Sequence, residues 1–544
     1  MNESSSPPER SGLAVAGTPK RILVTDTLAD SGLELLKGAP DVELDYRPGV
    51  KGAELLQAIG TADALISRSG TAITAELLDA GPRLKVAGRA GVGLDNVDVD
   101  AATSRGILVI NAPTANILSA TEHTMALLLS LCRNVAAADA SVKRGEWNRS
   151  RFMGIELSGK NLGVIGLGRI GSRVATRARA FDMRILAYDP YIHSSAAEKV
   201  NAEMVPLDQL LAEADFITVH TPLTDETKGM IGAAEIARMK DGVVMINCAR
   251  GGIYVEADLA AALESGKVAA AAVDVYEDEP PASDHPLLNA KNMILTPHIG
   301  ANTREAQDRV AVQTVEMVLE ALKGSIFVSA VNLPFQGISD ASAGPLIGLA
   351  EKLGLMAAQL LDGPPKSAEV ELWGIEERFA KILTVASLKG LLRPHLSHSV
   401  NFVNAQSLAE ARGIDSSVTL HPIPHDYTNL VTFRVSSDSD EICISGTLFS
   451  EKKARIVSLN NFRVEFEPEG WVLYMKNRDV PGVVGKVGTI LGDREINIAE
   501  YNLARAPEGG VAMAIVTVDT PVDRVTLDFI RSFKEMMDVR LLEL

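Results

Sequence analysis

Three side chains that could perform acid–base and carboxylate chemistry lie in the middle of this sequence: Arg250, Glu279 and His298. They come shortly after three apolar runs, which read VVMIN, AAAVDV and NMILT. A histidine exchanges protons near neutral pH, and a neighbouring carboxylate orients its ring and favours its protonated form. A guanidinium offers a carboxylate two parallel N–H groups. If the runs are parallel strands of one sheet, the three side chains leave the same edge and could act together on a small carboxylic acid.

Each of these residues also has a purely structural interpretation. Arg250 could pair with an internal acid such as Asp274 or Glu256, because a buried guanidinium without a partner is costly. His298 alone could be a packing residue at the end of a strand. The occurrence of all three at successive strand ends favours the catalytic interpretation.

A glycine-rich segment precedes them in a context that suits dinucleotide binding. Gly166, Gly168 and Gly171, with Arg169 and Ile170 between them, follow an apolar strand and open a helix. The first glycine permits a tight turn, the second lets the backbone approach a pyrophosphate, and the third allows close packing of helix on strand. The free N–H groups at the start of the helix attract the phosphates.

The next strand ends in an acidic residue that indicates which dinucleotide is bound. Asp189 stands 18 residues after Gly171, where a carboxylate accepts both ribose hydroxyls and repels a 2′-phosphate. The sequence therefore favours NAD over NADP. Thr221 and Pro222 end the third strand of this series and are expected at the same edge of the sheet.

The elements that must position these groups form two α/β units. From residue 21 to about 112, the runs RILVTD, ADALIS, LKVAGRA and ILVIN alternate with helical patterns, which predicts a first parallel sheet. One long helix is expected over about 119–144, and six apolar runs within 113–298 predict the nucleotide-binding unit. The helix expected at about 304–323 has no core of its own, so residues 299–330 are predicted to complete the first, substrate-binding domain, with a cleft between the two units.

The C-terminal part changes in character. Residues 335–467 contain the β-type runs SVNFVN, TNLVTFRV, EICISGTLF, ARIVSL and FRVEFEP, which predict an α+β domain. Residues 470–544 follow the order strand, helix, strand, strand, helix, strand, which is ferredoxin-like.

Composition narrows the class of protein. The 544 residues carry a formal net charge of −17, which disfavours nucleic acid and anionic membranes as partners. Three distant cysteines form neither a disulfide framework nor a metal site, and no metal is expected. Residues 1–20 read as a disordered tail without a signal peptide, and no apolar stretch is long enough to span a membrane. A cytoplasmic protein is expected.

These motifs, together with VHTPLTDETKGMI, NCARGG, VDVYEDEPP and TPHIGANTREAQ, resemble the D-2-hydroxyacid dehydrogenases over about residues 20–330. Within that family, GRAGVGLDNVDVDAATSRGILVINAP resembles the long-form D-3-phosphoglycerate dehydrogenase branch. The resemblance implies two Rossmann-like doubly wound units and NAD-dependent oxidation of 3-phospho-D-glycerate to 3-phosphohydroxypyruvate, the first step of L-serine biosynthesis.

The resemblance also implies roles for individual residues. Arg250 would hold the substrate carboxylate and polarise its carbonyl, while His298, supported by Glu279, would exchange the hydroxyl proton. Arg68, Arg89 and Asn116 would contact the substrate. The cofactor residues would be the fingerprint residues with Asp189, Thr221, Pro222, Cys248, Ala249, Asp274 and Gly300.

The last unit resembles an ACT domain, a module that pairs side by side and binds an amino acid at the seam. Asp479 and Asn497 are the matching positions, L-serine is the expected effector, and the assembly is expected to be a homodimer or homotetramer. Asn477 departs from the pattern, since many serine-binding members carry histidine there. Pure dimerisation is the alternative role for this domain. Residues 335–467 resemble the intervening domain of the long phosphoglycerate dehydrogenases.

Two other functions remain possible from the sequence. Related enzymes that act on other D-2-hydroxy acids keep the same three catalytic residues, and 2-oxoglutarate could be reduced as a side reaction. A non-enzymatic NAD(H)-sensing scaffold with this fold would also keep them, although a regulatory amino-acid domain suits a biosynthetic enzyme better.

Overall fold

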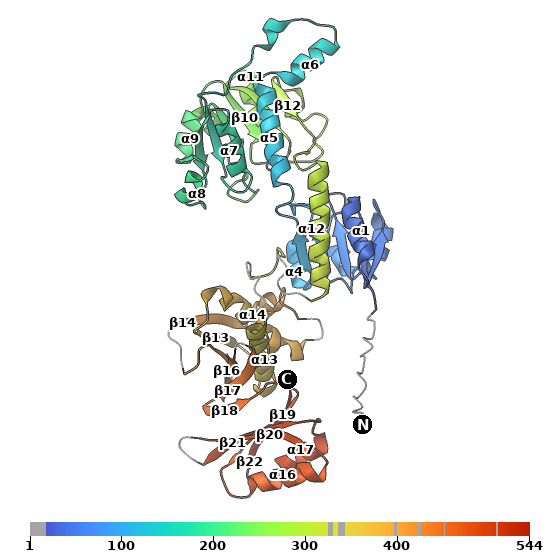
Figure 1. Cartoon of the computed structure of the whole chain (residues 1–544), viewed down its shortest axis with the longest axis vertical. Helices are drawn as coiled ribbons and strands as arrows, with labels where there is room; N and C mark the ends of the chain where they lie inside the picture. The colour runs from blue at the N-terminus through green and yellow to red at the C-terminus, as the bar shows by residue number, and fades with distance from the viewer. Residues whose placement is uncertain are drawn as a thin grey trace, which may run out of the picture.

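The computed structural model describes residues 18–324, 330–335, 343–396, 400–422, 426–450, 452–506 and 510–544. Most of the predicted tail, residues 1–17, lies outside the described residues. Four sheets follow one another along the length of the molecule (Figure 1). The predicted fold class is confirmed: two parallel α/β units are followed by an α+β unit and a ferredoxin-like unit.

The first unit is a five-stranded parallel sheet in the order β2-β1-β3-β4-β5. Its elements are β1 (Lys20–Val24), α1 (Asp30–Gly38), β2 (Val42–Tyr46), α2 (Gly52–Ile59), β3 (Ala64–Ser67), α3 (Ala75–Asp79), β4 (Val86–Arg89), α4 (Val99–Ser104) and β5 (Leu108–Asn111). Strand β2 was not predicted. It is an edge strand that leaves its residues at least partly exposed, so it lacks a continuous apolar run.

Helix α12 (Arg304–Leu322) packs back on this first sheet, as expected for the helix at 304–323. It lies against α1, β3, β4 and β5, and Figure 1 shows it running alongside the blue sheet. Two glycines permit the close approach. A Cβ at Gly32 would lie 2.9 Å from Ala311 Cβ, and one at Gly88 would lie 2.8 Å from Val318 Cγ2.

The second unit is a seven-stranded parallel sheet in the order β12-β11-β10-β9-β6-β7-β8. Its strands are β6 (Asn161–Ile165), β7 (Arg184–Tyr188), β8 (Glu203–Met204), β9 (Phe216–Val219), β10 (Val243–Asn247), β11 (Val268–Val273) and β12 (Met293–Leu295). Its helices are α5 (Ile117–Cys132), α6 (Val135–Lys143), α7 (Gly171–Arg179), α8 (Ser194–Glu198), α9 (Leu207–Glu213), α10 (Ala233–Arg238) and α11 (Glu256–Ser265). The six predicted strands are present, and only the two-residue β8 was missed.

The single helix predicted over about 119–144 is wrong, because the chain breaks into α5 and α6 with a bend of 63°. Asn134 adopts a left-handed conformation with φ 52°, and its side chain donates to the carbonyl of Met153. The Cys132 carbonyl accepts from Ile155 N–H instead of continuing the helix. The returning segment thus ends α5. Among the described residues no single helix meets the length and hydropathy needed to cross a membrane, and α5 and α6 meet them only as a bent pair.

The third unit has a six-stranded mixed sheet in the order β14-β13-β15-β16-β17-β18, covered by helices that contribute much of its core. Its elements are α13 (Gly344–Leu360), β13 (Ser367–Trp373), α14 (Ala380–Leu392), α15 (Ala405–Glu410), β14 (Asp415–His421), β15 (Leu430–Ser436), β16 (Glu441–Phe449), β17 (Lys453–Leu459) and β18 (Phe462–Phe466).

The run SVNFVN, predicted as β-type, is not a strand in its described part, residues 400–404. The Asn401 side chain accepts from Val403 N–H and donates to the Gly106 carbonyl of the first unit. Local side-chain bonding of this kind competes with a sheet ladder. The segment therefore forms a turn that joins the first and third units.

The last unit is a four-stranded antiparallel sheet in the order β20-β21-β19-β22, with both of its helices on one face. It comprises β19 (Trp471–Arg478), α16 (Val483–Asp493), β20 (Ile498–Arg505), β21 (Val511–Val518), α17 (Arg524–Arg531) and β22 (Met536–Glu543). The element order agrees with the predicted ferredoxin-like pattern.

Candidate active site

His298 and Glu279 form a hydrogen-bonded couple at the edge of the second sheet. His298 follows β12, Glu279 follows β11, and His298 Nδ1 lies 2.7 Å from Glu279 Oε2. The other oxygen, Oε1, accepts from Tyr276 N–H at 3.1 Å, so the carboxylate is held from two sides. The pair is partly exposed to solvent. With Nδ1 turned to the carboxylate, Nε2 is the ring nitrogen that could exchange a proton with a ligand.

A buried carboxylate fixes the loop that carries His298. Asp274 is 1% exposed and accepts from the Thr296 hydroxyl and from the N–H groups of Ile299 and Gly300 at 2.6–2.8 Å. Burial raises the pKa of Asp274, but hydrogen bonds led by the one from His123 outweigh it and leave the pKa below its usual value. His298 itself has φ 53°, a conformation that a non-glycine residue adopts only where its surroundings hold it.

Arg250 reaches across to the first unit. It follows β10, and its guanidinium lies against Gly93, where an added Cβ would be 2.9 Å from Nη2. Its Nε is 3.7 Å from Asp95 Oδ2, and its Nη1 donates to the Ala249 carbonyl. Neither Asp274 nor Glu256 is its partner, because Glu256 is 2.7 Å from His285 Nε2 and Asp274 clamps the His298 loop. The structural alternative for Arg250 therefore fails for both acids.

Two further arginines of the first unit lie near Arg250. Arg89 ends β4, and its Nε is buried with no hydrogen-bond partner among the described residues. Burial lowers the pKa of Arg89, and the positive charges of Arg68 and Arg250 lower it further. Arg68 follows β3, and its Nη1 is 3.3 Å from the Thr27 carbonyl. The three guanidinium groups outnumber the nearby carboxylates of Asp26 and Asp95, so the region suits a ligand with more than one negative charge.

Asn116 lies in the connection between the two units, directly before α5. Its carbonyl accepts from Ala120 N–H, which begins the helix. The structure shows no side-chain hydrogen bond from Asn116 to the arginines within the described residues. Its contact with substrate therefore stays a prediction.

The glycine fingerprint has the geometry that pyrophosphate binding requires. Gly166 has φ 89°, a Cβ at Gly171 would lie 2.0 Å from the Gly166 carbonyl oxygen, and the space around Gly168 is open. Ile170 immediately precedes α7, and Arg169 Nη1 is 3.4 Å from the Pro113 carbonyl. The turn and the helix start are therefore free of side chains that would block a phosphate.

Asp189 is held beside this turn. Its Oδ2 accepts from Leu167 N–H and its Oδ1 accepts from Tyr191 N–H, both at 2.9 Å. The carboxylate is therefore fixed beside the glycine turn, and its contact with a ribose stays a prediction.

The remaining predicted cofactor residues lie at the ends of neighbouring strands. Thr221 Oγ1 is buried without a hydrogen-bond partner among the described residues, and the Pro222 carbonyl accepts from the Thr227 hydroxyl. Ala249 N–H donates to Asn247, and Gly300 N–H donates to Asp274. Burial raises the pKa of the Cys248 thiol to about 12, so this group stays protonated. The buried Thr221 hydroxyl and the open glycine turn both fit a dinucleotide.

The sequence interpretation missed two residues of this region. His123 lies on α5, and its Nε2 is 3.2 Å from Thr296 Oγ1 and 3.3 Å from Asp274 Oδ1. Asp95, which faces Arg250, was not singled out. No motif in the sequence pointed to His123 or Asp95, because their contacts join segments that are far apart in the chain.

The sequence is similar to those of known protein families. Residues 125–300 match the NAD binding domain of D-isomer specific 2-hydroxyacid dehydrogenases, and residues 342–460 match the D-3-phosphoglycerate dehydrogenase intervening domain. The D-3-phosphoglycerate dehydrogenase of Archaeoglobus fulgidus is 40% identical, covering 96% of this chain and 100% of that protein. The chain belongs to the D-3-phosphoglycerate dehydrogenase family.

Other members of the D-3-phosphoglycerate dehydrogenase family agree with this assignment. The Bacillus subtilis protein is 41% identical, covering 96% of this chain and 99% of its own length. Among solved structures, the D-lactate dehydrogenase of Aquifex aeolicus complexed with NAD and lactic acid has a TM-score of 0.51 at 32% identity, covering 56% of this chain and 96% of that one. A glyoxylate reductase from Paecilomyes thermophila has a TM-score of 0.53 at 32% identity, covering 57% and 98%. This family member is an NAD-dependent oxidoreductase, as the resemblance implied.

Proposed function

We propose that this chain oxidises 3-phospho-D-glycerate to 3-phosphohydroxypyruvate with NAD as acceptor, in the first step of L-serine biosynthesis. The observation that carries the proposal is that Arg250, Glu279 and His298 follow the adjacent strands β10, β11 and β12 at one sheet edge, with the Glu279–His298 couple already hydrogen-bonded and Arg250 close enough to Arg89 of the first unit to affect its charge. The family relatives that match nearly the whole chain support the same substrate.

The reaction can be assigned to these side chains step by step. Arg250 binds the substrate carboxylate through its planar fork and orients the C2 hydroxyl toward His298. His298 Nε2 accepts the hydroxyl proton as the carbonyl forms, and the Glu279 carboxylate stabilises the imidazolium. Bound NAD would supply the acceptor for the hydride that leaves C2. Arg68 and Arg89 hold the phosphate.

The glycine turn and Asp189 are the residues that would hold NAD. The turn and the start of α7 would take the pyrophosphate, and Asp189 would accept the ribose hydroxyls. A carboxylate at this position repels a 2′-phosphate, so NADP is expected to be a poor substitute.

A steady-state assay tests the function directly. The purified chain with NAD and 3-phospho-D-glycerate should produce NADH absorbance. Oxidation of D-lactate or unphosphorylated D-glycerate, and reduction of 2-oxoglutarate by NADH, should each be at least about tenfold slower. The reason is that these substrates lack the phosphate that two arginines contact. Equal rates with D-lactate would assign the chain to another D-2-hydroxy acid. No turnover with any acid, together with tight NADH binding, would favour the NAD(H)-sensing scaffold.

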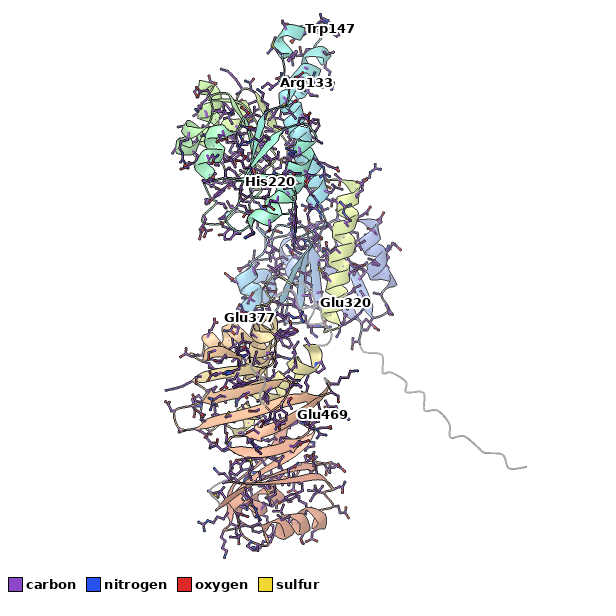
Figure 2. All side chains as sticks on the ribbon, turned by 60° about the vertical axis from the view of Figure 1, so that its left-hand side comes forward. Arg133, Trp147, His220, Glu320, Glu377 and Glu469 are labelled. Atoms are coloured by element: carbon purple, nitrogen blue, oxygen red, sulfur yellow. The ribbon has the colours of Figure 1, made fainter. Side chains whose placement is uncertain are left out.

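We infer that the chain assembles into a homodimer or homotetramer. The arm formed by α6 and the following segment extends away from the second sheet, and Figure 2 labels Trp147 near its tip. Trp147 and Met153 are 81% and 85% exposed, and Val135 and Val142 of α6 are also exposed. Apolar side chains in such number on an extended arm are typical of a subunit contact.

L-serine is the proposed effector of the ferredoxin-like unit. Asp479 N–H donates to the Gly510 carbonyl and the Asn497 carbonyl accepts from Asp519 N–H, so the two residues lie beside opposite ends of β21. Asp479 is 3.2 Å from Arg505 Nε, and Asn497 donates to Asp519. A single chain therefore offers only half of a site, and a two-fold pair of these units is needed to bring Asp479 of one copy to Asn497 of the other. Asn477, the position that departs from the serine-binding pattern, is buried and donates to the Arg478 carbonyl.

Asp479→Ala is expected to leave turnover without serine unchanged and to weaken the response to L-serine by about tenfold or more, because the carboxylate would no longer meet the ammonium group of the effector. The measurement is the L-serine concentration that halves, or doubles, the initial rate. Glu465→Ala, an exposed acid on β18, is the matched control and should respond as the natural chain does. A chain whose rate ignores serine before any substitution would assign the unit to dimerisation alone.

A further inference from the structure

The third and fourth sheets meet at a seam that contains a cavity of about 350 Å³. Strand β18 lies against β20, and Figure 2 labels Glu469 close to where the third sheet gives way to the fourth. The cavity is lined by Arg455, Glu467, Glu469, Ala499, Glu500 and Thr517. Its wall is therefore built from both domains, and a ligand there would touch both.

The register of the fourth sheet shows which of its faces closes this seam. Thr517 pairs with Val472 on one side and with Glu500 on the other. Val472 and Ile515 belong to the core cluster that continues into the third unit, whereas the helices α16 and α17 pack on the opposite face. Since directly paired residues share a face, Thr517 and Glu500 face the third unit.

Several polar atoms at the seam are shielded from solvent without a partner. Within the described residues, Arg455 Nε, Thr517 Oγ1 and the nearby Asn502 Nδ2 have no hydrogen-bond partner, although each atom is buried. Buried donors are paired in nearly all native structures because desolvating them without a partner costs free energy. Three unpaired donors in one seam indicate that a ligand with an acceptor group binds there.

The acids of the cavity differ in their pairing. Glu467 lies 3.0 Å from Arg455 Nη2, and Glu469 lies 3.4 Å from Lys352 Nζ. Glu500 makes no ion pair within the part of the chain that the structure describes. Three carboxylates and one guanidinium give the lining a net charge of −2, which opposes a phosphate or another pure anion. A pure cation would satisfy Glu500 and leave the Arg455 and Thr517 donors unpaired.

We propose that this seam binds a small zwitterionic α-amino acid. Its carboxylate accepts from Arg455 Nε and the Thr517 hydroxyl, and its ammonium group donates to Glu500. The site differs from the one proposed at Asp479 and Asn497. Asp479 lies just past the end of β19, seven residues from Val472, or about 23 Å at the rise of a strand. Asn497 lies three residues before Glu500, but its side chain donates to Asp519 and does not line the cavity. Because the seam ligand contacts both domains, its binding strengthens their docking.

Isothermal titration of the full chain, without NAD or substrate, tests this proposal. Glycine, L-alanine and L-serine are titrated in turn into the natural chain and into Glu500→Gln, Thr517→Val and Asp479→Ala. At least one of the three amino acids should bind with an affinity that falls about tenfold or more in Glu500→Gln and Thr517→Val and is unchanged in Asp479→Ala. Because no catalysis is involved, the result is independent of the proposed reaction.

Inorganic phosphate and ethylamine serve as the anionic and cationic comparison probes. The proposal is overturned if all three amino acids bind Glu500→Gln as they bind the natural chain. It is also overturned if only phosphate or only ethylamine responds to the seam substitutions, because the site would then take a different class of ligand. Glu500 is exposed and Thr517→Val preserves shape, so both variants should keep the thermal midpoint of the unliganded chain.

Discussion

His298→Ala is expected to lower kcat by about 10²–10⁴, the range contributed by a positioned general acid–base group. The expectation rests on the geometry of the couple: Nδ1 is held by Glu279 at 2.7 Å, which leaves Nε2 as the nitrogen expected to take the hydroxyl proton. NAD binding should change little, because the glycine turn and Asp189 are on other loops. The measurements are steady-state kcat with 3-phospho-D-glycerate and NADH binding by fluorescence.

The control for this variant is His395→Ala, which removes an exposed histidine of the third unit and should keep full activity. Glu279→Gln should lower kcat less than His298→Ala and should shift the pH dependence of the rate, because it weakens the orientation of the imidazole without removing it. If His298→Ala keeps more than about a tenth of the natural kcat, histidine is not the acid–base group.

Arg250→Ala is expected to lower kcat/KM for 3-phospho-D-glycerate by about 10²–10³, which is the effect of losing a donor aimed at the reacting group. The guanidinium is held in place by the Ala249 carbonyl and by its position against Gly93. Arg250→Lys should recover only part of the loss, because an ammonium group lacks the planar fork. The measurements are kcat and KM, each determined separately, and the affinity of the variant for NADH.

Arg238→Ala is the matched control, since Arg238 lies on the surface of the same unit and pairs with Asp208 and Glu235. Its activity should equal that of the natural chain. A loss of NADH affinity in Arg250→Ala that matches the loss of kcat/KM would assign this arginine to the cofactor and not to the substrate.

Most of the fold could be predicted because its elements carry local signals. The strands of the second sheet are buried on both faces and read as continuous apolar runs, and the glycine fingerprint marks the first turn. Apart from the edge strand β2 and the two-residue β8, the errors occurred where distant segments decide the conformation. The break at Asn134 depends on residues 153–155 returning to the end of α5, and the turn at Asn401 depends on a carbonyl of the first unit.

The sequence by itself determined the residue types, the order of the strands along the chain and the placement of Arg250, Glu279 and His298 after three of them. It also predicted NAD over NADP through the acid at 189, since that preference depends on a single charge near the ribose. These features follow from local periodicity and from spacing within one βα unit.

Only the tertiary structure decided which groups meet. The contact of His298 with Glu279, the clamp of Asp274 on the His298 loop, the approach of Asp95 to Arg250 and the seam around Thr517 all join residues from different loops or different domains. Hydrogen bonds and charges act over a few ångströms. The spacing of two residues along the chain does not give their distance in space. That distance is set by the packing of sheets and helices.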